Sequence, residues 1–122
     1  MASYVSIKGW IECSDDDIKI IQENINNFWN NCPFNIEEKE SAKIYKSGWV
    51  FPTNSFNWSS YIFFGACVKS YFIIYFEKCI KTIMELDIEI SGFFELDYYE
   101  DSYKVHWKIN NGNLIQTTRA CP

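Results

Sequence analysis

The sequence has few of the residues that catalytic and metal sites need. Among its 122 residues, histidine occurs once, as His106, and arginine occurs once, as Arg119. A single histidine excludes histidine-rich metal sites and leaves little for a catalytic triad. Phosphate-binding loops, dinucleotide-binding fingerprints, nucleophile elbows and zinc-protease motifs are all missing from the sequence. We therefore predict no catalytic residue, no metal and no cofactor, which means a protein that is not an enzyme.

The cysteines do not form a recognisable framework. There are five of them, an odd number, and no two have Cys-x-x-Cys spacing. Neither a zinc site nor a disulfide scaffold is expected from this pattern. We expect most of the thiols, among them Cys67 and Cys79, to be buried and reduced, because free cysteine packs like a small apolar residue. Cys121 is expected to be exposed.

Long apolar runs are also missing. The most apolar stretch, residues 61–75, is interrupted by Gly65, Lys69 and Ser70. It is too short and too polar for a membrane helix, which needs about 20 apolar residues. The first ten residues lack the basic segment and apolar core of a secretory signal. We therefore expect a cytoplasmic protein with no membrane contact.

What the chain does contain is apolar and acidic. Apolar residues make up 48% of it, aromatic residues 19%, and the formal net charge is −5. This apolar content is too high for intrinsic disorder, and the length suits a single domain over residues 1–122. A nucleic-acid-binding protein would need clustered lysine and arginine, so the acidic balance argues against that class.

The hydrophobic pattern predicts an α+β fold. Ser14 and Asp17 stand at the two positions of a helix capping box. The polar residues 34–46 are typical of a loop, in which a short helical turn is an option. Strands are predicted at residues 4–12, 48–51, 58–67, 88–98, 103–109 and 114–115, and helices at residues 15–29, directly after Ser14, and 71–86. The order β-α-β-β-α-β-β suggests an antiparallel sheet with two helices packed on one face. A ferredoxin-like topology is one option.

The last third of the chain predicts a hairpin in detail. Two strand patterns flank Glu100 and Asp101, and the pair Asn111-Gly112 signals a second tight turn. Symmetrical pairing about the first turn places one face in the core and leaves the other charged and solvated. The predicted pairs are Phe94 with Trp107, Leu96 with Val105, Tyr98 with Tyr103, Asp97 with Lys104, and Glu95 with His106.

Two groups of acidic residues have no structural explanation in this prediction, and they are the candidate contacts with a partner. An acidic surface attracts a basic partner and raises the rate of association, although such residues commonly serve only to keep a surface solvated. The candidate partner-binding residues are Glu95, Asp97, Glu100 and Asp101 in the hairpin, the exposed aromatic residue Tyr99 beside them, and Glu37, Glu38 and Glu40 in the predicted loop.

The aromatic strands suggest a family. Ser47-Gly48-Trp49-Val50-Phe51-Pro52 is followed by the strand pattern of residues 57–66, by Gly92-Phe93-Phe94, and by Trp107 near the Asn-Gly turn. Together with size and acidity, this pattern resembles small immunity proteins of bacterial contact-dependent growth inhibition and related polymorphic toxin systems. The resemblance implies a cytosolic antidote that binds the C-terminal toxin domain of a cognate effector, commonly a nuclease. It would block the active site or the substrate groove of that domain.

Two other functions remain open. One is a small-molecule-binding regulatory module of ferredoxin-like topology, whose ligand would lie at a sheet edge or an oligomer interface. The other is a small enzyme that uses a cysteine or a carboxylate. A monomer or a weak homodimer is expected, since unpaired strand edges allow chains to associate.

Overall fold

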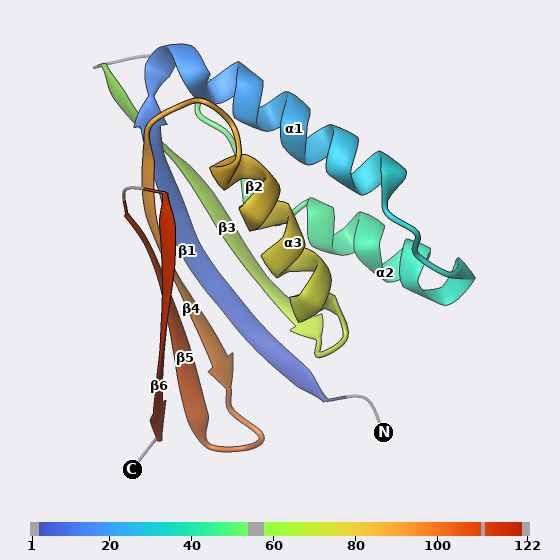
Figure 1. The fold of residues 1–122 in the computed structure, drawn as a ribbon. Helices are drawn as coiled ribbons and strands as arrows, with labels where there is room; N and C mark the ends of the chain where they lie inside the picture. Colours follow the sequence, from blue (N-terminus) through green and yellow to red (C-terminus); the bar gives the residue numbers. More distant parts are fainter. Residues whose placement is uncertain (1–2, 54–57, 111, 121–122) are drawn as a thin grey trace.

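The computed structural model describes residues 3–53, 58–110 and 112–120, which form an antiparallel sheet and three helices (Figure 1). The strands are β1 (Tyr4–Ser14), β2 (Trp49–Val50), β3 (Ser59–Lys69), β4 (Ile90–Tyr98), β5 (Tyr103–Asn110) and β6 (Asn113–Ala120). The helices are α1 (Ile18–Asn31), α2 (Ile36–Lys46) and α3 (Phe72–Met84), and one 3-10 turn, η1 (Asp15–Asp17), follows β1. None of these helices is long and apolar enough to cross a membrane.

The six strands lie in the order β2-β3-β1-β4-β5-β6, and every neighbouring pair is antiparallel. β1 lies in the interior of the sheet, between β3 and β4. Since both of these strands run opposite to β1, they are parallel to each other, and α3 connects them across one face. Figure 1 shows the helices on that side of the sheet and no helix on the other side.

The core lies between the helices and the sheet, and Phe76 of α3 is at its centre. Its ring is fully buried and contacts Phe64, Phe94, Trp49 and Trp107, with centroids 4.7, 5.3, 5.7 and 6.0 Å away. These four rings belong to β3, β4, β2 and β5. One side chain of α3 therefore packs against four of the six strands, because strands bring alternate residues to the same face.

The prediction of a loop at residues 34–46 was wrong, because residues 36–46 form α2. Asn35 begins this helix with a capping box: its side chain accepts a hydrogen bond from the Glu38 amide (2.8 Å), and the Glu38 carboxylate accepts one from the Asn35 amide (3.0 Å). Only Ala42 and Tyr45 of α2 are buried. With so narrow an apolar face, the helix has little of the periodicity by which helices are recognised in a sequence.

The capping box predicted at Ser14 and Asp17 does not form. Neither side chain caps a helix, and residues 15–17 make the 3-10 turn instead. The Asp15 carboxylate accepts a hydrogen bond from the Ser60 hydroxyl (2.9 Å), and the Asp15 amide donates to the Trp58 carbonyl (3.1 Å). This aspartate therefore ties the end of β1 to β3.

The predicted pairing of the last hairpin is confirmed at all five positions, from Phe94 with Trp107 to Tyr98 with Tyr103. The final strand is longer than predicted, since β6 extends to Ala120 and pairs with β5 over its whole length. Gly112 in the preceding turn has a φ of 77°, which glycine adopts without strain. Asn111, predicted as the first turn residue, lies outside the described residues, as does Cys121.

We expect Phe76→Ala to lower the free energy of unfolding by about 3–5 kcal/mol, because it removes a ring packed against four strands and leaves a cavity. Urea denaturation followed by circular dichroism measures the change. Ile74→Ala on the same helix is the control: Ile74 is 63% exposed, so its loss should cost no more than about 0.5 kcal/mol. Equal destabilisation by the two variants would contradict the role given to Phe76.

Candidate functional site: the uncovered face of the sheet

The face of the sheet opposite the helices carries a row of apolar side chains that crosses all six strands. Cross-strand pairing places its members directly beside one another, one from each strand. In spatial order they are Val50, Phe63, Trp10, Phe93, Lys108 and Ile115, and we call them the apolar row. Five of the six are apolar, although they lie on the side of the sheet that no helix covers.

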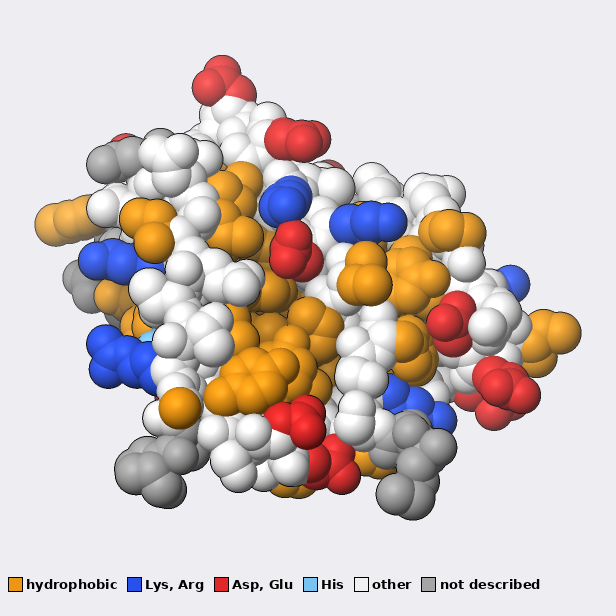
Figure 2. Space-filling model, turned by 60° about the horizontal axis from the view of Figure 1, so that its bottom comes forward, with side chains coloured by type: hydrophobic (Ala, Val, Ile, Leu, Met, Phe, Trp, Pro, Cys, Tyr) orange, Lys and Arg blue, Asp and Glu red, His pale blue; other side chains and the backbone are white. Residues whose placement is uncertain are grey.

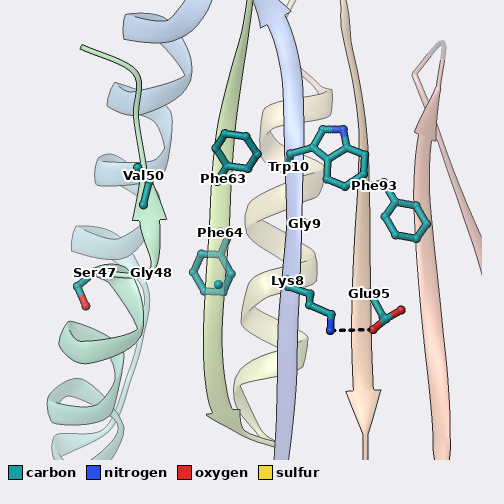
Figure 3. Close-up of a pocket in the computed structure, with 11 residues that line it drawn as sticks. Lys8, Gly9, Trp10, Ser47, Gly48, Val50, Phe63, Phe64, Phe93 and Glu95 are labelled. Carbon is teal, nitrogen blue, oxygen red and sulfur yellow. Dashed lines mark ion pairs between the residues drawn. The ribbon is translucent and has the colours of Figure 1, made fainter.

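The apolar row is accessible to solvent. Trp10 is 39% exposed, Phe63 is 51% exposed and Val50 is 58% exposed. The rings of Trp10 and Phe93 contact each other at 5.5 Å, and Tyr61 stacks beside Phe63 at 6.2 Å. Figure 3 shows Phe63, Trp10 and Phe93 on adjacent strands in front of the sheet, with α3 behind it. A contiguous exposed apolar area of this kind is typical of an interaction site.

Beside the apolar row the face is hollowed. The hollow has a volume of about 580 Å³, and its lining includes Phe63, Val50, Lys8 and Glu95. It forms because Gly65, which points to this face, has no side chain. A Cβ atom built on Gly65 would meet no other atom within 4 Å. The hollow is therefore open to a side chain or a small ligand that approaches from solvent.

A cluster of charges closes one side of the hollow. The Glu95 carboxylate lies 3.3 Å from Lys8 Nζ, 3.1 Å from His106 Nε2 and 3.8 Å from Lys104 Nζ, and its side chain is only 18% exposed (Figure 3 marks the Lys8 pair). Burial acts to raise the pKa of Glu95, but hydrogen bonds with His106 and Lys8 and the charge of Lys104 hold it below its ordinary value. The negative charge of Glu95 is thus matched within the protein.

The charge of this face differs in sign from the charge of the chain. Five basic and three acidic side chains point to it, whereas the whole chain has a formal charge of −5. The basic ones are Lys8, Lys69, Lys104, Lys108 and Arg119, and the acidic ones are Glu12, Glu95 and Asp97. The acidic surplus therefore lies on the helices, the turns and the strand ends. Figure 2 shows another side of the molecule, where acidic and basic side chains both surround a central hydrophobic area.

The structure divides the predicted acidic contacts among three places. Glu95 and Asp97 are on the uncovered face, Glu100 and Asp101 are in the β4–β5 turn, and the predicted group at residues 37–40 lies on α2. Figure 1 places α2 and the β4–β5 turn in separate parts of the fold, so they do not form one acidic surface.

Besides Glu95, three more of the predicted contact residues have partners within the chain. Glu38 completes the capping box of α2, and the Glu100 carboxylate accepts a hydrogen bond from the Tyr4 amide at 2.7 Å. The Tyr99 hydroxyl lies 3.6 Å from the Cys67 sulfur, and this hydrogen bond, together with burial, raises the pKa of Tyr99 to about 12. Tyr99 is nevertheless half exposed, so it remains accessible to a partner.

Among the residues that the structure describes, no thiol is placed with a base as a nucleophile. Burial raises the pKa of Cys13 to about 11 and also raises that of Cys79, which disfavours the reactive thiolate. Cys67 was predicted to be internal, but it is exposed, because it points to the uncovered face. His106 pairs with Glu95, and the structure describes no contact between His106 and a cysteine. Over residues 3–53, 58–110 and 112–120, no group of three or more ligating side chains could hold a metal ion.

The apolar row was missed from the sequence. The strand predicted at residues 58–67 has apolar residues at both odd and even positions, which is typical of a strand that is buried on both faces. In the structure, Ile62 and Phe64 are buried beneath the helices, while Tyr61 and Phe63 are exposed. Apolar residues on both faces of a strand therefore have two explanations: both faces are buried, or one face is an exposed binding surface. The hydrophobic pattern is the same in both cases, so it does not distinguish them.

Comparisons with known proteins assign no family. No family model, no curated protein and no solved structure matches this chain.

We expect Glu95→Gln to destabilise the protein at pH 7 by at most about 1 kcal/mol, because the lysine partners are largely exposed. The pKa of Glu95 is lower in the folded chain than in the unfolded one, so its contribution is complete above the ordinary value of 4.5. That contribution disappears as the pH falls through the folded pKa. Urea denaturation of both proteins between pH 7 and about pH 2.5 measures the difference in stability. A difference that is independent of pH would contradict the ion-pair cluster.

Proposed function

We propose that the protein is an immunity protein, which neutralises a cognate bacterial toxin domain by binding it through the uncovered face of the sheet. The observation that carries this proposal is the apolar row, which crosses the six paired strands and has aromatic side chains on the three adjacent strands β3, β1 and β4. Tryptophan and other aromatic residues supply much of the binding energy in protein interfaces. We expect the toxin to act in the cytoplasm, so the binding would take place in that compartment. Nucleases remain the toxin class that we expect.

The rigidity of this surface favours binding. Trp10 and Phe93 are on the interior strands β1 and β4, whose backbones are paired on both sides. Their positions are therefore set before a partner arrives, which reduces the entropy lost on association. Inhibition by occlusion needs such a surface and needs no chemical step.

The acidic groups have a smaller part in this proposal than the sequence suggested. Glu95 is held by Lys8, His106 and Lys104, and separating it from them would offset much of the gain from a new partner. Glu37 and Glu40 of α2 form no ion pair with described residues and remain candidates for a second contact.

We further propose that β1 to β4 with the helices form a ferredoxin-like unit, to which β5 and β6 are added at one edge. Two features support it. The partial order β2-β3-β1-β4 is that of the split β-α-β arrangement, and each of its two helical connections joins strands separated by one other strand.

We expect the double variant Trp10→Ser, Phe63→Ser to lose protection against the toxin. The variant would be co-expressed with the candidate toxin domain encoded directly upstream, and cell survival would be scored. Calorimetry with the purified domain should show affinity weakened by about 30-fold or more, since aromatic hot spots contribute about 2 kcal/mol or more. Unfolding curves would establish that the variant is folded.

Two control variants separate this proposal from a purely electrostatic one. Ile74→Ser changes an exposed apolar residue of α3, and Glu37→Lys with Glu40→Lys reverses charge on α2. Both should bind within about two-fold of the wild type, because neither alters the uncovered face. Loss of binding only in the α2 variant would move the interface to the acidic helix. No binding by the wild-type protein would reject the immunity function for that toxin domain.

The hollow beside Gly65 supports the alternative of a small-molecule-binding module, because its volume lies in the usual range for ligands. Thermal unfolding of the protein in the presence of nucleotides and amino acids would test this alternative. A ligand of this site raises the melting temperature of the wild type, and it should not do so for Gly65→Leu, whose side chain fills the open space. An equal rise in both proteins would place the ligand elsewhere, and no rise would count against this function.

A further inference from the structure

β6 forms a long edge of the sheet. It pairs with β5 along one side from Asn113 to Ala120, and this length exceeds that of a typical strand. On its other side, the structure describes no hydrogen bond from residues 114–120 to another segment. In Figure 1 this strand lies at the outer margin of the sheet, on the side away from the helices α1 and α2. A row of backbone donors and acceptors therefore faces solvent.

The opposite margin of the sheet is protected in ways that β6 is not. There β2 has only two residues and is soon followed by Pro52, and the Tyr45 hydroxyl accepts a hydrogen bond from the Lys69 amide at 3.0 Å. Short edge strands, proline and covering segments are the usual means of preventing edge pairing. β6 has no proline, its pairing with β5 runs without a bulge, and Arg119 is its only charged residue.

The sequence of β6 also allows it to pair with itself. Ile115, Thr117 and Arg119 point to the uncovered face, whereas Leu114 and Gln116 point to the helix side. In an antiparallel pair, residues directly opposite each other lie on the same face of the sheet. Two copies of β6 therefore pair about a twofold axis only at the level of one residue, which then lies opposite its own copy. An axis at a level between two residues would place residues of different faces opposite each other. An axis at Thr117 places threonine opposite threonine and Ile115 opposite Arg119. It brings no two like charges together.

We propose that β6 is a dimerisation edge, which pairs antiparallel with β6 of a second copy about a twofold axis at Thr117. Gln116 is a poorer centre, because its side chain already accepts a hydrogen bond from the Trp107 indole at 3.0 Å. The two sheets become continuous, and both uncovered faces lie on the same side of the dimer. The dimer would thus present two copies of the apolar row to a partner, but the edge pairing does not depend on the proposed immunity function.

Sedimentation velocity on the purified chain tests the proposal, from about 1 µM to about 500 µM. The wild type should approach twice the 14.5 kDa of one chain at the upper end of this range. Thr117→Lys and Thr117→Glu should each stay monomeric, since like charges meet at the axis. An equimolar mixture of the two should recover the dimer, because opposite charges then face each other. Ile74→Lys, on exposed α3, is the matched control and should dimerise like the wild type.

Three results would overturn the proposal. One is a wild-type protein that remains monomeric at about 500 µM. The second is a Thr117→Lys variant that dimerises as well as the wild type, which would place the interface away from β6. The third is a mixture of the lysine and glutamate variants that stays monomeric while the wild type dimerises, which would exclude an axis at Thr117. Circular dichroism of each variant establishes that Thr117, which is exposed, was replaced without unfolding the chain.

Discussion

The packing of α3 on one face of the sheet is the interaction on which the rest of the structure depends. Phe76 contacts rings from four strands, and these contacts fix which face of each strand is buried. Because the described helices lie together on that face, none of them covers the other face. The strand residues that alternate with those packed on the helices therefore point to the uncovered face, where some, such as Phe63, are exposed and others, such as Glu95, are largely shielded by their neighbours. The character of those residues then decides whether the face is an ordinary wet surface or a place for a partner.

The uncovered face of the sheet contains both a solvated charged row and an apolar row, and the two rows are adjacent. Lys8, Glu95 and His106 occupy neighbouring positions across three strands and satisfy one another, as expected of a solvated antiparallel face. The apolar row lies two residues further along the same strands, and its rings gain only partial burial from their neighbours. The aromatic residues at three successive cross-strand positions, Phe63, Trp10 and Phe93, contribute little to stability for the apolar area that they leave in water. A requirement outside the chain, such as a partner surface, accounts for them better than folding does.

Local patterns predicted the parts of the fold in which sequence neighbours decide the structure. The hairpin register follows from strict alternation on both sides of one turn, and the helix predicted at residues 71–86 follows from the helical spacing of its apolar residues. In other parts of the fold, contacts between residues far apart in the sequence determine the local structure. Asp15 bonds to Ser60, a partner 45 residues away, so its role as a helix cap was a wrong prediction. α2 is held by a capping box and by two buried residues, which is too weak a pattern to distinguish it from a loop. Cys67 and Phe63 were misplaced because apolar residues on both faces of a strand indicate burial and binding equally.

The net charge of the chain does not show which of its surfaces are acidic, for a physical reason. A total of −5 says nothing about where the charges lie, and screening limits each one to its surroundings within about 10 Å. The uncovered face has more basic than acidic side chains, and its most buried acid, Glu95, has three basic neighbours. A basic substrate groove would be repelled by Lys108 and Arg119 on this face, whereas an apolar surface bordered by acidic groups would be attracted. If the toxin is a nuclease, contact through the apolar row would therefore favour a site beside its phosphate-binding cleft over the cleft itself.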